Sequence, residues 1–124
     1  MESTLLTYNK GEFIFRKGSE AEDMYIIRSG KVRILKDVDR KMVELATFGE
    51  GEFLGELAVL AGRPHAAAAI AIEDCTVAVL KRDAMMKALE ECPRWVDMLL
   101  HSLANRLTHM NERIGIDLIY IRDK

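Results

Sequence analysis

The stretch of sequence that decides the fold is Phe53-Leu-Gly-Glu-Leu-Ala-Val-Leu-Ala-Gly-Arg-Pro-His-Ala-Ala67. Gly55 and Glu56 precede a segment, Leu57 to Leu60, that we expect to form a single short helical turn. The free N-terminus of a helix offers unpaired backbone N–H groups and a partial positive charge, both of which suit an anion. A glycine at its start lets a ligand approach the backbone closely. Small residues follow the turn from Ala66 to Ala69, so the stretch predicts a loop that binds a phosphate group.

Two further segments, one on each side, complete a larger pattern. They are Gly18-Ser-Glu-Ala-Glu-Asp-Met-Tyr-Ile-Ile-Arg-Ser-Gly-Lys-Val32 and Leu103-Ala-Asn-Arg-Leu107. Together with residues 53–67 they resemble the cyclic-nucleotide-binding domain family. In that family the phosphate-binding cassette reads roughly Phe-Gly-Glu-(Leu/Met)-Ala-Leu, a few residues, then Pro-Arg-(Ala/Ser/Thr)-Ala-Thr. The resemblance covers nearly the whole chain, and the last segment is similar to the start of the long helix in catabolite-activator-type regulators.

The resemblance implies a binding site for a cyclic nucleotide, with cyclic AMP as the leading candidate. It places the phosphate on the backbone of Leu57, Ala58 and Ala66, and the ribose 2′-hydroxyl on the carboxylate of Glu56. It also places Asn111 beside the base, where the amide can hydrogen-bond a purine edge. The expected ligand-binding residues are Gly55, Glu56, Leu57, Ala58, Arg63, His65, Ala66, Ala67, Arg106 and Asn111.

One position departs from the family pattern, since His65 stands where the family has its phosphate-binding arginine. Arginine gives a permanent charge and two parallel N–H bonds, whereas histidine, with a reference pKa of about 6.5, is mostly neutral near pH 7. Losing a charged hydrogen bond of about 1.5–3 kcal/mol would weaken binding about 10- to 150-fold. Arg63 could compensate if it points to the same side of an extended segment as His65. If His65 supplies the cation, affinity should rise as pH falls below about 7.

Simpler interpretations of these residues stay open. Arg63 and Arg106 could be solvated surface residues rather than partners of the phosphate or of Glu56. Glu56 could act only as a favourable charge at the helix N-terminus, which contributes about 0.3–1 kcal/mol. The pocket could also have lost cyclic-nucleotide binding, because of His65 and because the chain lacks the hydroxyls that the best-known family member uses near the base.

The composition fits one soluble globular domain over residues 1–124, with 49% hydrophobic and 31% charged residues. The formal net charge of −2 argues against nucleic acid as the main partner, because such binding needs clustered positive charge. No apolar run approaches the roughly 20 residues that span a bilayer, and the N-terminus lacks the features of a signal peptide. The expected location is therefore the cytoplasm.

Cys75 and Cys92 are isolated in sequence and are expected to be ordinary thiols.

The hydrophobic periodicity changes after residue 81. Residues 1–81, which include the cassette 53–67, show short strands separated by glycine turns, and residues 82–124 are helical. We therefore expect a mixed β+α fold: an antiparallel, jelly-roll-like β-roll of about eight strands with flanking helices and a long C-terminal helix. The strand signals are centred on Phe13–Phe15, Tyr25–Ile27, Val32–Leu35, Met42–Phe48, Ala69–Ile72 and Thr76–Leu80.

Two helices are expected in the second part. Asp83 is the expected N-cap of the first, Ala84 to Glu90, and Pro93 fits the first turn of the second, over 93–121. An apolar stripe on the second helix keeps heptad spacing, so this helix could pair in parallel with its copy in a homodimer. The resemblance favours this, since catabolite-activator-type regulators pair through this helix, although the stripe could instead pack wholly on its own domain. The stripe consists of Leu100, Leu103, Leu107, Met110, Ile114 and Ile121.

Residue types that serve catalysis or metal binding are sparse. The histidines are His65, His101 and His109, no His-x-His motif occurs, and no carboxylate pair has an evident acid/base partner. We expect no enzyme activity, no metal, and no cofactor other than a cyclic nucleotide acting as an effector.

The leading functional hypothesis is a ligand-sensing regulatory module that binds a cyclic nucleotide and signals by moving its C-terminal helix between two states. The alternative is a degenerate domain that binds no cyclic nucleotide and serves as a dimerisation or protein-interaction module. A third option is a different anionic effector at the same helix N-terminus. The helix-turn-helix domain that follows the long helix in catabolite-activator-type regulators is missing here. We therefore expect no nucleic-acid or membrane partner for this chain alone, which is either a free-standing sensor or a piece of a longer protein.

Overall fold

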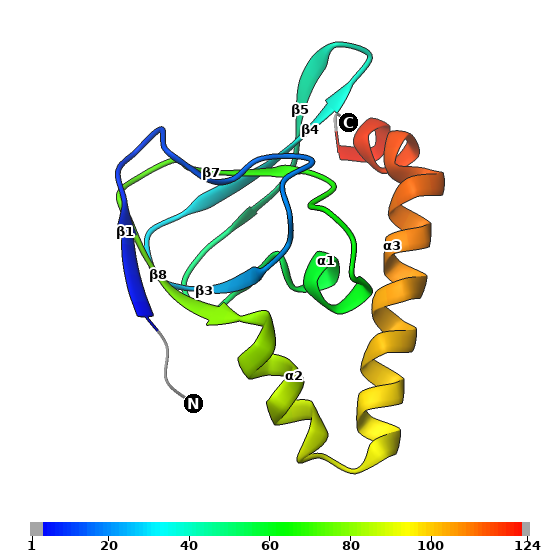
Figure 1. Cartoon of the computed structure of the whole chain (residues 1–124). Coiled ribbons are helices and arrows are strands. Elements are labelled where there is room, and N and C mark those ends of the chain that lie inside the picture. The colour runs from blue at the N-terminus through cyan, green and yellow to red at the C-terminus, as the bar shows by residue number, and fades with distance from the viewer. Residues whose placement is uncertain (1–3, 123–124) are drawn as a thin grey trace.

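The computed structural model describes residues 4–122, with side chains described for residues 4–110. Within this range the chain forms eight strands and three helices (Figure 1). The strands are β1 (Thr4–Tyr8), β2 (Phe13–Phe15), β3 (Asp23–Ser29), β4 (Val32–Val38), β5 (Lys41–Phe48), β6 (Phe53–Leu54), β7 (Ala68–Ala71) and β8 (Cys75–Lys81). The helices are α1 (Glu56–Ala61), α2 (Arg82–Glu90) and α3 (Arg94–Arg122).

The strands form two four-stranded sheets, in the orders β1-β8-β3-β6 and β2-β7-β4-β5. Neighbouring strands pair antiparallel throughout, for example Tyr25 with Val79 between β3 and β8, and Ile34 with Ala69 between β4 and β7. Each sheet has one apolar face to bury, and the two faces pack on each other. The predicted antiparallel roll in a mixed β+α fold is therefore confirmed. The largest fully buried side chains are Ile27, Leu54, Val32, Val59 and Val77.

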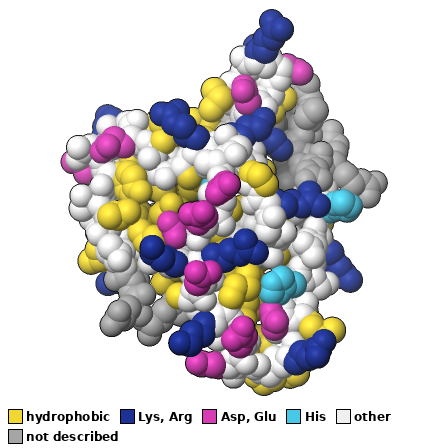
Figure 2. All heavy atoms as spheres, viewed as in Figure 1, with side chains coloured by type: hydrophobic (Ala, Val, Ile, Leu, Met, Phe, Trp, Pro, Cys, Tyr) yellow, Lys and Arg dark blue, Asp and Glu magenta, His cyan; other side chains and the backbone are white. Residues whose placement is uncertain are grey.

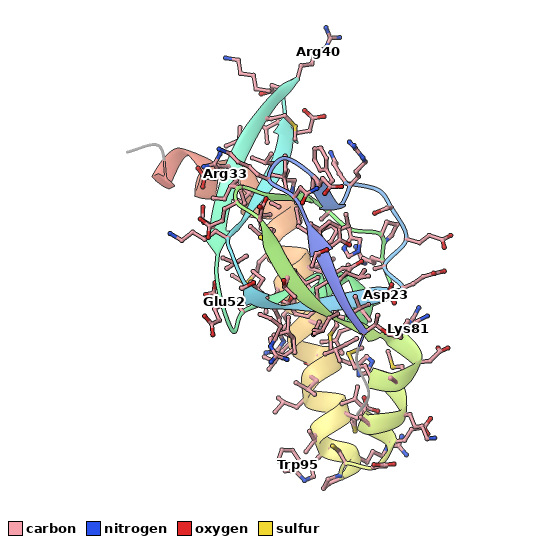
Figure 3. All side chains as sticks on the ribbon, turned by 90° about the vertical axis from the view of Figure 1, so that its left-hand side faces the viewer. Asp23, Arg33, Arg40, Glu52, Lys81 and Trp95 are labelled. Atoms are coloured by element: carbon pink, nitrogen blue, oxygen red, sulfur yellow. The ribbon has the colours of Figure 1, made fainter. Side chains whose placement is uncertain are left out.

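The hairpin of β4 and β5 projects from the roll, and Figure 3 shows Arg40 pointing outward from its tip. Asp39 and Arg40 form its two-residue turn, and both have positive φ, at 50° and 66°. Two consecutive positive φ values match the twist of a tight hairpin. The glycine turns of the sequence marked most of the strands, but periodicity alone did not predict β1 or the two-residue β6.

Helix α2 begins directly at the end of β8, which corrects one prediction. Its N-cap is Lys81, whose backbone is extended, and no side-chain hydrogen bond caps the helix. Asp83 lies inside the first turn instead, because the strand continues to Lys81 and the Arg82 N–H donates to the Glu22 carbonyl at 2.8 Å. The negative charge of Asp83 still favours the helix dipole from that position.

Helix α3 is 29 residues long and runs alongside α1 toward the β4–β5 hairpin (Figure 1). Its inner face includes Ala104, which is 2% exposed. Its outer face presents an apolar row that the roll leaves uncovered: Leu99, Leu103, Leu107 and Met110. Of the stripe expected from the sequence, Leu100 is half-buried, and the side chains of Ile114 and Ile121 lie outside the described residues. The whole stripe therefore does not pack on its own domain.

Candidate ligand-binding site

The cassette is built around α1, a helix of six residues between two glycines with left-handed backbone. Gly55 is the N-cap, with φ 77°, and Gly62 ends the helix with φ 68°. The first backbone N–H groups of a helix have no intrahelical partner, and no side-chain hydrogen bond caps α1. The expected helical turn is present, one residue longer at each end than predicted. The backbone N–H groups at its start can donate hydrogen bonds to an anion.

His65 is held deep beside this helix start. Its side chain is 5% exposed, and its ring stacks on Phe15 with centroids 3.8 Å apart and planes 13° apart. The backbone fixes its position, since the His65 N–H donates to the Ser19 carbonyl at 3.0 Å and the Gly18 N–H donates to the His65 carbonyl at 2.8 Å. Burial lowers the pKa of His65 below its usual 6.5. The imidazole is therefore neutral near pH 7 and offers no permanent charge to a phosphate.

Glu56 occupies the first position of α1 and is half-buried. Burial raises the pKa of its carboxyl, and a hydrogen bond from its own backbone N–H opposes this rise. Within the described residues, no ion pair joins Glu56 to Arg106. The carboxylate therefore remains available as an acceptor at the helix start.

The structure separates Arg63 from His65. Arg63 lines a pocket of about 420 Å³ between the cassette and α3, together with Asn105, Arg106, His109 and Met110. His65 lines a different pocket, of about 360 Å³, on the β2–β3 side. Arg63 and His65 therefore line different pockets, and the geometry does not support the alternative in which both point to the same side. Arg63 and Arg106, by contrast, are brought together across 43 residues of sequence by the packing of α3 on α1.

The remaining predicted site residues fall on the cassette as follows. Leu57 and Ala58 lie in the first turn of α1 and are half-buried, Ala66 is exposed, and Ala67 is half-buried just before β7. The side chain of Asn111 lies outside the described residues.

No group of three His, Cys, Asp or Glu among the described residues is placed to hold a metal ion. Nor does any helix in that part of the chain have the length and apolar character to cross a membrane.

Sequence reasoning missed the surroundings of His65. Phe15 lies 50 positions earlier, and Glu20, Glu22 and Asp23 line the same pocket (Figure 2 shows acidic side chains gathered over the β3 region). No local pattern links these residues to the cassette. The only available signal was the order of the segments, which brings residues 18–32 next to residues 53–67 in the resemblance.

Comparison with known proteins agrees with this geometry. A family model described as "Cyclic nucleotide-binding domain" matches residues 5–92. A CRP-like cAMP-activated global transcriptional regulator from Mycobacterium tuberculosis is 30% identical over 114 residues, which are 91% of this chain and 50% of the regulator.

Two solved structures are similar in fold. The cAMP-bound form of EAL enzyme Bd1971 gives a TM-score of 0.80 at 28% identity, over 96% of this chain and 31% of that chain. The regulatory subunit of a cAMP-independent protein kinase A from Trypanosoma cruzi, bound to guanosine, gives a TM-score of 0.66 at 28% identity, over 71% of this chain and 32% of that chain. The present chain thus spans half or less of each of these three proteins.

Proposed function

The chain belongs to the cyclic nucleotide-binding domain family, and we propose that it is a regulatory module whose cassette binds a cyclic nucleotide, with cyclic AMP as the first ligand to test. The observation that carries the proposal is the uncapped start of α1 behind Gly55, with Glu56 beside it. Backbone N–H groups there suit the phosphate, and the carboxylate suits a ribose hydroxyl. The similarity to a cAMP-activated regulator and to a cAMP-bound enzyme supports the same choice.

The proposed site lacks a positively charged side chain near the expected position of the phosphate. This lack favours a second candidate ligand. His65 is buried and neutral, and Arg63 lines a different pocket. A site without a nearby charge discriminates little in favour of a phosphate, so an uncharged nucleoside becomes a competitor. One structural relative is bound to guanosine. We propose guanosine as the second ligand to test.

The proposed role is binding rather than catalysis, since the matched family model describes a binding domain. We further propose that the module forms a homodimer through α3. The support is the uncovered apolar row on its outer face, where Leu103 and Leu107 are 44% and 45% exposed. Because the inner face of α3 packs on α1, a ligand at the cassette and the position of α3 would depend on each other. Movement of α3 is the proposed signal.

Isothermal titration calorimetry at pH 7.5 with cyclic AMP, cyclic GMP and guanosine tests these proposals, on the wild type and on His65→Arg. We expect saturable binding of cyclic AMP to the wild type. In His65→Arg the affinity for cyclic AMP should rise about 10- to 150-fold, because a charged hydrogen bond is added, and the affinity for guanosine should stay constant. Met42→Arg, which adds the same charge at an exposed site on β5, is the matched control and should change neither.

The outcomes separate the candidates. Guanosine binding without cyclic AMP binding would favour the nucleoside. Absence of heat for every ligand, together with no thermal shift at millimolar ligand, would contradict both and favour the interaction module without a nucleotide.

A further inference from the structure

A second pocket, of about 360 Å³, opens on the β2–β3 side of His65. No residue of α1 lines it, but it adjoins the start of that helix, because His65 and Phe15 lie beside Gly55. Part of its wall is aromatic, formed by Phe13, Phe15 and Tyr25. This combination of an apolar wall and a polar rim is typical of sites for small molecules.

The rim of this pocket is acidic. Glu20, Glu22 and Asp23 line it, against the single basic lining residue Arg16. Within the described residues none of the three carboxylates forms an ion pair. Lys81 lies opposite Asp23 in the β3–β8 register, and Figure 3 shows the two at the same end of the sheet, yet no ion pair joins them. The pocket therefore carries negative charge that the described side chains do not neutralise in pairs.

The aromatic wall is suited to a cation as well. The Arg16 guanidinium carbon lies 4.0 Å from the centroid of the Phe13 ring. This is a cation–π contact, and it shows that a guanidinium group can pack on the Phe13 ring of this wall. Arg16 itself is exposed, so it can yield its place to another cation.

His65 adds a hydrogen-bonding group to the wall of this pocket. Its side chain is 95% buried, being 5% exposed, and lines this pocket, but within the described residues its ring nitrogens make no hydrogen bond. A neutral imidazole has one acceptor nitrogen and one donor N–H. The only fully buried side-chain nitrogen or oxygen without a partner in the described part of the chain belongs to Arg33, so the ring nitrogens of His65 keep some access to the pocket. One of them can therefore accept a hydrogen bond from a molecule there.

We propose that this pocket binds a small organic cation of the alkylammonium or guanidinium class. The positive group would lie among Glu20, Glu22 and Asp23, the carbon chain would lie against the aromatic wall, and one N–H would donate to His65. An inorganic metal ion fits less well, because no group of three His, Cys, Asp or Glu in the described part of the chain is placed to coordinate one. This site is additional to the cyclic-nucleotide site, and His65 lies between the two.

Agmatine, which carries both an ammonium and a guanidinium group, is the probe. Calorimetric titration of the whole chain, without nucleotide, should give saturable binding. Glu22→Gln should weaken it about two- to fivefold, as expected for a partly exposed ion pair. His65→Phe keeps a ring that can stack on Phe15 but removes the acceptor nitrogen. This variant should also bind agmatine more weakly. Arg16→Ala removes the competing cation and should strengthen binding.

Glu50→Gln is the matched control, because Glu50 is exposed and does not line the pocket. Equal losses in Glu22→Gln and Glu50→Gln would mean general charge attraction and would overturn the proposal, as would the absence of saturable binding at 10 mM agmatine, a concentration about tenfold above a millimolar dissociation constant. A capped Gly-Arg-Gly peptide distinguishes the source of the cation. Binding of agmatine alone supports a free amine, and equal binding of the peptide supports an arginine side chain of a partner.

Discussion

At the scale of single residues, the cassette depends on a contact between Gly55 and His65. A Cβ atom built on Gly55 would lie 2.8 Å from His65 Cε1 and 3.5 Å from Phe15 Cε2. The φ of 77° at Gly55 is also one that residues with a side chain rarely adopt. A glycine at position 55 is therefore required both by its own backbone and by the stacked His65–Phe15 pair behind it.

Gly55→Ala should destabilise the fold by about 2–4 kcal/mol, the sum of backbone strain and a clash with rings that cannot move away. Gly51→Ala is a matched control, because its φ is 86° but nothing lies within 4 Å of the added Cβ. It should cost only about 1 kcal/mol. Urea unfolding gives both values, and equal losses would mean that the His65 ring does not constrain position 55.

The pH dependence of stability should reveal the buried state of His65. Its pKa is lowered in the folded protein, so its contribution is complete above the unfolded value near 6.5 and is lost as pH falls through the lower folded value. The stability of the wild type relative to His65→Phe should therefore fall below about pH 6.5, by at most about 1.4 kcal/mol per pH unit.

Glu56 acts in the opposite sense, since its pKa is raised by burial. Its contribution is complete below its usual 4.5 and is lost as pH rises through the raised value. Both proteins keep Glu56, so it cancels in the difference between them. A difference that stays constant from pH 7.5 to pH 4.5 would show that His65 is not buried as a neutral group. Thermal or urea unfolding at each pH supplies the measurement.

At the scale of the element, helix α3 has one face packed on α1 and another apolar face that is exposed. Ala104 allows close approach to α1, while the apolar row on the other side extends back to Met98 and to Trp95, which Figure 3 shows at the start of the helix. An exposed row of this length on a helix is typical of an interface. The dimer proposal rests on this face.

The double variant Leu103→Lys with Leu107→Lys should convert the proposed dimer to a monomer, because it places like charges where two helices would meet. Sedimentation velocity measures the change. Met42→Lys is the control, since Met42 is 55% exposed but lies on β5 rather than on α3. A wild type that sediments as a monomer at all concentrations would contradict the dimer.

At the scale of the whole molecule, the two sheets share one core and should unfold together. Ile27 is fully buried in that core, so Ile27→Ala should cost about 2–5 kcal/mol. Leu5→Ala, on the exposed side of β1, should change stability by no more than about 0.5 kcal/mol. Far-ultraviolet circular dichroism and Trp95 fluorescence should follow one urea transition, and separate transitions would show that α3 unfolds independently of the roll.

Much of the fold could be predicted because its signals are local. Glycine turns and period-two alternation marked strands such as β4 and β5, and the change to three- and four-residue spacing marked α3. The prediction failed at Asp83, where capping chemistry suggested a helix start that the β8 register overrode. It also missed β6, because two residues carry no periodicity and pair with β3 only once the chain has folded.

The sequence by itself determined the β+α class, the cassette with its short helix, and the replacement of an arginine by His65, since these depend on residue type and spacing. Only the tertiary structure decided where His65 points and which residue stacks on it. It also decided that Arg63 lines a pocket with Arg106 and not with His65. Those outcomes depend on contacts between residues up to 50 positions apart, as for Phe15 and His65. Side-chain direction at such contacts is set by packing, which no local pattern encodes.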